Sequence, residues 1–200
     1  MPCLFHEVQH DLKLITEPTI PVLSVEELKE HLRVDIPDED PLIKGYIAAA
    51  TKMVEEDAEV ALLLQTWALY LDEFPDVIEL QRLPVAGVTS IVYLDSSGVS
   101  QTQSSSTYRV DTAGSPGRIT PAYGQSWPTT YPVSNAITVT FTAGASTRDD
   151  VPEIAKQAIR LLVAHWYRSR EAVVSTGAQP IEVPLAYGAC INRLRWSGVV

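Results

Sequence analysis

Cysteine is scarce in this chain, and its scarcity excludes a disulfide framework. Only Cys3 and Cys190 occur among the 200 residues, and they lie near opposite ends of the sequence. Small disulfide-stabilised domains carry several closely spaced cysteines. The Cys-x-x-Cys pairs that hold structural zinc are also missing. We therefore expect two reduced thiols and a fold that depends on its hydrophobic core.

Long apolar runs are missing as well. A membrane-spanning helix needs about 20 consecutive apolar residues, and no charge-free apolar stretch of this sequence approaches that length. The first residues lack the basic segment followed by an apolar segment that is typical of a secretion signal. With 46% hydrophobic residues, the chain is expected to bury a proper core. Because it lacks a membrane span and a secretion signal, we expect no membrane partner and synthesis in the cytoplasm.

Basic residues are few and unevenly distributed. Residues 1–80 hold 5 Lys and Arg against 18 Asp and Glu, residues 81–150 hold 4 against 4, and residues 151–200 hold 6 against 3. Proteins that wrap nucleic acid need clustered Lys and Arg to neutralise phosphates. The net charge of −10 argues against that function. The acidic residues either solvate the outer faces of helices or form a face that repels nearby DNA.

Catalytic motifs are almost absent. The sequence has no G-x-S-x-G elbow, no P-loop and no G-x-G-x-x-G. Its one enzyme-like motif is His6-Glu7-Val8-Gln9-His10, a match to H-E-x-x-H, which on a helix binds zinc through two imidazoles with the glutamate as general base. No helix-length apolar pattern surrounds this motif, and Pro18 and Pro21 follow it. We therefore predict a non-enzymatic protein with no catalytic, cofactor-binding or metal-binding residues.

Helical patterns occupy two separate parts of the chain. Ser24-Val25-Glu26-Glu27 matches a capping box and predicts a helix that ends before Pro37. Asp40-Pro41 starts a second helix, in which apolar residues recur at three- and four-residue spacing to about residue 59. Asp150-Val151-Pro152-Glu153 starts a third, which runs to about residue 170.

The third predicted helix has an apolar stripe and a basic end. Trp166 lies on the stripe and is expected to be a buried anchor between helices, and His165 is interpreted as a core histidine. Arg160, Arg168 and Arg170 crowd the later turns, where cations complement the helix dipole.

The middle of the chain has strand patterns. Its Thr, Tyr and Trp residues alternate with apolar ones between turn signals, as on a pleated surface. Strands are expected near residues 63–72, 77–82, 88–94, 107–111 and 136–142. The polar stretch from Ser96 to Thr107 is interpreted as either a hairpin tip or a mobile loop.

The last residues are predicted to form an extended tail that docks on a neighbour. Gly177 and Pro180 break the chain, and the following pattern alternates basic and apolar side chains. Arginine and tryptophan are frequent interface anchors. The candidate interface residues are Arg168, Arg170, Arg193, Leu194, Arg195 and Trp196. Alternatively, this segment simply folds back on its own chain.

The order of these signals resembles the head-tail connector (head-completion adaptor) proteins of tailed bacteriophages and gene transfer agents. The resemblance covers roughly residues 20–172, and its matching pieces lie in the helical and the strand-patterned regions alike. They are Leu23-Ser24-Val25-Glu26-Glu27-Leu28-Lys29-Glu30-His31-Leu32-Arg33-Val34, Asp38-Glu39-Asp40, Gln65-Thr66-Trp67, Leu83-Pro84, Tyr93-Leu94-Asp95 with Gly98, Trp127-Pro128, Val139-Thr140-Phe141 with Gly144, Val151-Pro152, and Tyr167-Arg168-Ser169-Arg170-Glu171.

The resemblance implies a structural ring subunit. Proteins of this family form a ring, commonly of twelve copies, between the portal and the tail, continue the DNA channel and provide the surface to which the tail attaches. The implied partners are further copies of the chain, a portal protein, a downstream tail or stopper protein, and DNA in transient contact. The implied location is the head-tail junction of a phage-like particle.

The expected fold class is α+β, with a small helical bundle, an inserted antiparallel β-rich lobe and an extended C-terminal tail. The expected boundaries are an N-terminal extension at 1–23, a helical core at 24–61 and 149–176, a β-rich region at 62–148 and a docking tail at 177–200. Two other functions remain open on the sequence alone. One is a β-rich module that binds carbohydrate or protein through Tyr123, Trp127 and Tyr131, and the other is a zinc-dependent hydrolase that uses residues 6–10.

Overall fold

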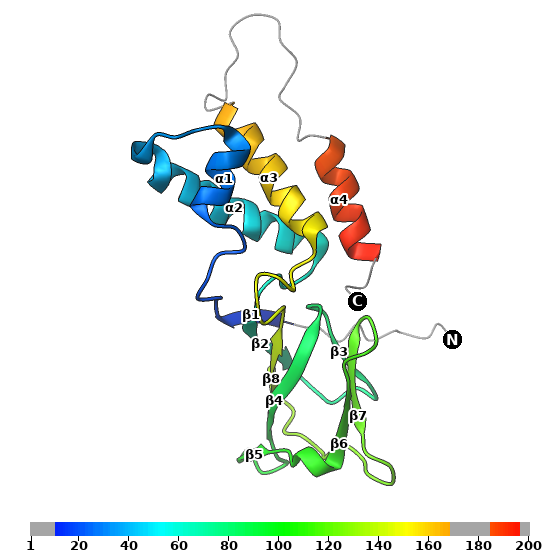
Figure 1. The fold of residues 1–200 in the computed structure, drawn as a ribbon. Coiled ribbons are helices and arrows are strands. Elements are labelled where there is room, and N and C mark those ends of the chain that lie inside the picture. The colour runs from blue at the N-terminus through cyan, green and yellow to red at the C-terminus, as the bar shows by residue number, and fades with distance from the viewer. Residues whose placement is uncertain (1–10, 169–184, 197–200) are drawn as a thin grey trace, which may run out of the picture. The chain divides into compact units, whose positions relative to one another are not determined.

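The computed structural model describes residues 11–168 and 185–196. These residues form two compact units (Figure 1). The β unit contains residues 11–17 and 64–144, and the helical unit contains residues 18–63, 145–168 and 185–196. The predicted α+β class, with helices and antiparallel sheets, is confirmed. No described helix has the length and apolar character needed to cross a membrane.

The first two helices of the helical unit begin where the sequence predicts. Helix α1 spans Val25–Leu32, and its predicted capping box is confirmed. The Ser24 side chain accepts a hydrogen bond from the Glu27 backbone N–H, and the Glu27 carboxylate accepts one from the Ser24 N–H. A single 3-10 turn, Pro37–Glu39, leads into helix α2, which spans Asp40–Ala58.

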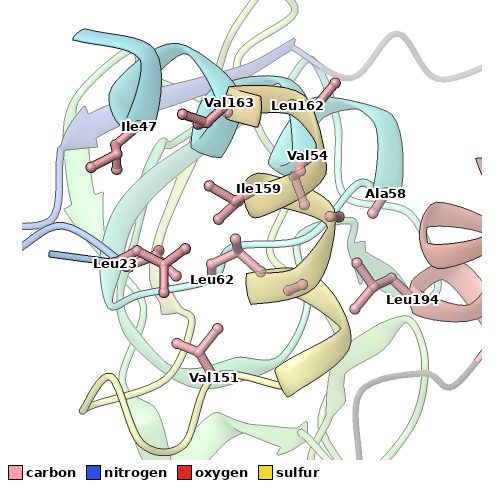
Figure 2. Packing of buried hydrophobic residues seen from close by; sticks show 14 of the residues in the cluster. Leu23, Ile47, Val54, Ala58, Leu62, Val151, Ile159, Leu162, Val163 and Leu194 are labelled. Carbon is pink, nitrogen blue, oxygen red and sulfur yellow. The ribbon is translucent and has the colours of Figure 1, made fainter. Parts of the chain in front are cut away.

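Helix α3, Glu153–Arg168, contacts the other three helices of the unit. Its residues Ile159, Leu162 and Val163 are fully buried in one hydrophobic cluster, which Figure 2 shows from close by. Leu23, Leu62 and Val151, which lie outside the helices, belong to the same cluster. The core of this unit therefore forms from chain segments on both sides of the β-rich region.

Residues 185–196 are not extended, contrary to the predicted tail. They form helix α4, Leu185–Trp196, and Tyr187, Ile191 and Leu194 are buried in the hydrophobic cluster. These residues are separated by four and three positions, a spacing that places them on one side of a helix. The alternating arginines of the sequence obscured this periodicity, since Arg193 and Arg195 flank the buried Leu194.

The β unit contains two antiparallel sheets. The five-stranded sheet has the order β1 (Asp11–Thr16), β2 (Gln65–Leu71), β8 (Ile137–Ala143), β4 (Val85–Leu94) and β5 (Ser100–Thr102). The three-stranded sheet has the order β3 (Ile78–Leu80), β7 (Gly117–Pro121) and β6 (Tyr108–Asp111). In the central strand β8, buried and partly exposed residues alternate strictly, as expected of a strand that has one face on a core.

Three strands were not predicted from the sequence. Strand β1 lies in the expected N-terminal extension and pairs with β2, whose paired residues lie 50 or more positions further along the chain. Strand β5 consists of three exposed polar residues and pairs with β4, so the stretch from Ser96 to Thr107 begins as a hairpin. Strand β7 follows the turn at residues 114–116 and pairs with β3 and β6. Strands β5 and β7 are too short for their pattern to be recognised alone, and β1 is an edge strand with no buried residue.

Gly117 marks a close approach of β7 to β4. A Cβ atom at Gly117 would lie 2.8 Å from Val85 Cγ2, nearer than van der Waals contact permits. We expect Gly117→Ala to lower the free energy of unfolding by about 1–3 kcal/mol, because the Val85 side chain or the buried backbone must shift to relieve the overlap.

Urea unfolding of four proteins checks this expectation: the parent, Gly117→Ala, Val85→Ala and the double variant. Val85→Ala removes the overlapping methyl groups, so the double variant should lose less stability than the two single changes combined. If the stability loss of the double variant equals the sum of the two single losses, Gly117 is not constrained by Val85.

Candidate interaction surfaces

The predicted zinc-like motif, residues 6–10, lies outside the described residues. Within residues 11–168 and 185–196, no group of three or more His, Cys, Asp or Glu side chains could hold a metal ion. Cys190 is a partly buried free thiol on α4. His165 and Trp166 are each partly buried, so Trp166 is less buried than predicted. Its ring packs against Tyr46 with the centroids 6.0 Å apart.

The candidate interface residues occupy different environments. Arg168 is exposed as the last residue of α3, and Arg193 and Arg195 are exposed on α4. Arg170 lies outside the described residues, and so does the side chain of Trp196. Leu194 is 1% exposed and packs in the core of its own chain. It is therefore not available as an anchor on a neighbour, because the helical spacing of α4 turns it inward.

Two hydrogen bonds attach α4 to the end of α2. The Tyr187 hydroxyl donates to the Asp57 carboxylate at 2.6 Å, and Arg195 Nε donates to the Asp57 carbonyl oxygen. Burial and the hydrogen bond to Asp57 raise the pKa of Tyr187, so its hydroxyl stays a neutral donor to higher pH than that of an exposed tyrosine. These bonds attach α4 through Tyr187 and Arg195, and the Arg193 side chain is exposed.

Acidic side chains gather around α1 and the segment that follows it. Glu26, Glu30, Asp35 and Asp38 are exposed. The Glu26 carboxylate accepts hydrogen bonds from the Glu26 backbone and from Ser24, and these hold the pKa of Glu26 below its usual range. Glu26 therefore remains ionised in the first turn of the helix, where negative charge is favourable. We call these four residues the acidic surface of the helical unit.

Of the three aromatic residues considered for ligand binding, Trp127 packs against another ring, and Tyr123 and Tyr131 are exposed. Trp127 stacks on Phe74 with ring centroids 4.7 Å apart and planes 6° apart, and Phe74 meets Tyr93 edge to face at 5.7 Å. Tyr123 is fully exposed, and Tyr131 is 44% exposed. The stacking of Phe74 on Trp127 was not predicted, because the two residues are more than 50 positions apart in the sequence.

Comparison with known proteins defines the class of protein to which this chain belongs. A family model described as "Head completion protein" matches residues 21–180. Since the match covers most of the chain, the chain belongs to the head completion protein family. It is a structural protein of the head-tail connector class, as the resemblance implied.

Solved structures from gene transfer agent (GTA) particles are similar over nearly the whole chain. One chain from the neck of an empty GTA particle, computed with C6 symmetry, is 28% identical, with a TM-score of 0.72 over 92% of this chain and 95% of that chain. A chain from the virion of a native GTA particle is also 28% identical, with a TM-score of 0.73 over 92% of this chain and 94% of that chain. A third chain, from the neck of a native GTA particle computed with C12 symmetry, is 28% identical, with a TM-score of 0.67 over 92% of this chain and 94% of that chain. No curated protein matches the chain.

Proposed function

We propose that this chain forms a closed ring between the portal and the tail of a phage-like particle, and that the ring continues the DNA channel. The observation that carries the proposal is the 28% identity over 92% of the chain to subunits of GTA necks. Those necks were computed with sixfold and twelvefold rotational symmetry, which is the symmetry of closed rings. The fold and the family are shared, so the same place in a particle is the simplest function.

Ring closure requires two different complementary surfaces on each subunit. The acidic surface around α1 is our candidate for one of these two surfaces. Charge complementarity at a ring contact orients neighbours during assembly more than it adds affinity. The acidic surface also suits a position near the channel, because negative charge keeps passing DNA from sticking.

The portal is the partner that we assign to Arg168 and Arg193. Both side chains are exposed at the ends of packed helices, so they can steer and orient a docking event without disturbing the core. Arg195 contributes less to this surface, because it donates to the Asp57 carbonyl of its own chain. Arg170 and Trp196 remain candidates by sequence alone.

The function that we propose is non-enzymatic. The chain belongs to a structural family, and residues 6–10 have no helical apolar pattern around them. Replacing His6 and His10 by alanine should therefore leave assembly unchanged. Stoichiometric zinc in the purified protein, together with peptidase activity that the double variant loses, would contradict the proposal.

Native mass spectrometry of the purified chain, alone and mixed with the portal protein of the same particle, tests the ring. We expect a single ring species bound to the portal ring. The double variant Arg168→Glu and Arg193→Glu should bind the portal about tenfold or more weakly, since each change replaces attraction by repulsion.

The matched control is Lys44→Glu and Lys52→Glu on α2, which changes the net charge by the same amount at two other exposed positions. It should bind as the parent does. Equal losses in both variants would show that net charge, and not the α3 and α4 surface, governs portal binding. A parent chain that forms no ring with or without the portal would overturn the proposed function.

A further inference from the structure

One end of the β unit gathers three chain segments that are distant in sequence: residues 72–77, 94–99 and 127–135. The Asn135 N–H donates to the Asp72 carboxylate at 2.6 Å, and the Tyr131 N–H donates to the Leu94 carbonyl at 3.0 Å. The stacked pair of Phe74 and Trp127 joins the first segment to the third. We call the outer side of these three segments the strand-end surface.

Apolar side chains at the strand-end surface are unusually exposed. Val99 is 54% exposed, Tyr131 44% and Val133 45%. Val99 and Tyr131 are on neighbouring segments, because a Cβ atom at Gly98 would lie 3.8 Å from the Tyr131 ring. A cluster of exposed apolar and aromatic residues on one site is typical of a protein interface, where such residues act as anchors.

The strand-end surface is held in place before any partner binds. The Asp95 carboxylate accepts hydrogen bonds from the backbone N–H groups of Ser97 and Val99 and from the side-chain amide of Gln101. These hydrogen bonds keep the pKa of Asp95 below its usual range and fix the turn that carries Val99. A surface ordered in advance loses little conformational entropy on binding.

The charge of the strand-end surface has one sign. Asp72, Glu73 and Asp76 are exposed in the segment that Asn135 contacts, and residues 72–77, 94–99 and 127–135 contain no Lys, Arg or His. An apolar centre with an acidic rim is complementary to a protein loop that presents an apolar tip between basic side chains.

We infer that the strand-end surface binds the tail-side neighbour of the adaptor through such a loop. This inference rests on the proposed function, in which the ring has a portal on one side and a tail protein on the other. The portal is assigned to the basic residues Arg168 and Arg193. The strand-end surface carries charge of the opposite sign, so we assign it to a different partner, the tail-side neighbour.

Site-specific photo-crosslinking in assembled particles tests the identity of the partner. A benzophenone amino acid is placed at Tyr131 and, as a control, at Val110, which lies on β6 of the same unit and is 38% exposed. We expect Tyr131 to crosslink to a tail-side protein, through a peptide that mass spectrometry shows to contain Lys or Arg. Crosslinks from Tyr131 to the portal or to a second copy of this chain, or no crosslink, would overturn the inference.

Charge substitutions test the contribution of the surface to assembly. Tyr131→Asp and Val133→Asp place a further negative charge at the apolar centre, and Val110→Asp is the matched control. Particles that carry either of the first two variants should contain about tenfold less tail protein per portal, with parental amounts of this chain. Particles with Val110→Asp should be complete.

The outcomes separate this inference from the proposed function. Normal tail content in the Tyr131→Asp and Val133→Asp particles overturns the inference and leaves the ring proposal intact. Loss of this chain from the heads in those variants, with circular dichroism and melting as in the parent, assigns the surface to the portal or to a ring neighbour and also overturns the inference. Absence of the parent chain from purified particles overturns the proposed function itself.

Discussion

Removal of residues 185–200 is expected to lower the free energy of unfolding of the helical unit by about 5 kcal/mol or more. The deletion takes away α4, and with it the buried side chains of Tyr187, Ile191 and Leu194. Burial of one large apolar side chain contributes about 1.5–3 kcal/mol, and the total stability of a domain is about 5–15 kcal/mol. Urea unfolding followed by circular dichroism measures the loss, and a fall in soluble yield should accompany it.

Two single substitutions refine this expectation. Leu194→Ala should cost about 2–5 kcal/mol, because it leaves a cavity in the cluster. The neighbouring Arg193→Ala should change stability by less than about 0.5 kcal/mol, because Arg193 is exposed. A truncated chain that unfolds at the urea concentration of the parent would show that α4 does not belong to the core. The docking tail predicted from the sequence would then be correct for these residues.

Phe141→Ala is expected to destabilise the β unit by about 3–5 kcal/mol. Phe141 is fully buried on β8, the strand that pairs with β2 on one side and with β4 on the other. It lies opposite Trp67 of β2 and Val88 of β4, so its removal opens a cavity at the centre of the five-stranded sheet. Urea unfolding followed by the ¹⁹F signal of 5-fluorotryptophan at Trp67 reports on this unit.

The control for Phe141→Ala is Thr140→Ala, its neighbour on the same strand. Thr140 points to the opposite face and is partly exposed, so its loss should cost about 1 kcal/mol or less. Equal effects of the two substitutions would show that the buried face of β8 is not the principal core of this unit.

Local sequence signals predicted much of the helical unit. The capping box at Ser24 and the Pro41 start of α2 each depend on interactions within one turn of a helix. The burial of Ile43, Ile47, Ala50, Val54 and Ala58 follows from their spacing alone. The alternation in β8 likewise predicted a half-buried strand. These features are decided by residues close in sequence, and they could be recognised without a structure.

The interaction surfaces depended on contacts between distant residues. Phe74 and Trp127 meet only because the sheet brings their loops to one end, and the exposure of Val99 and Val133 is known only from the folded chain. The arginines of α4 were recognised as interface candidates, but the inward direction of Leu194 was not. Its environment is set by the packing of α4 against α2 and α3.

The sequence by itself determined the fold class, the starts of α1, α2 and α3, the family resemblance and the uneven distribution of charge, because each is carried by local pattern or composition. The tertiary structure decided that β1 joins a sheet with strands far along the chain, that α4 completes the helical core and that three loops form the strand-end surface. The physical reason is the same in each case: these segments have weak patterns of their own, and their positions are set by burial and backbone pairing against partners that only the folded chain supplies.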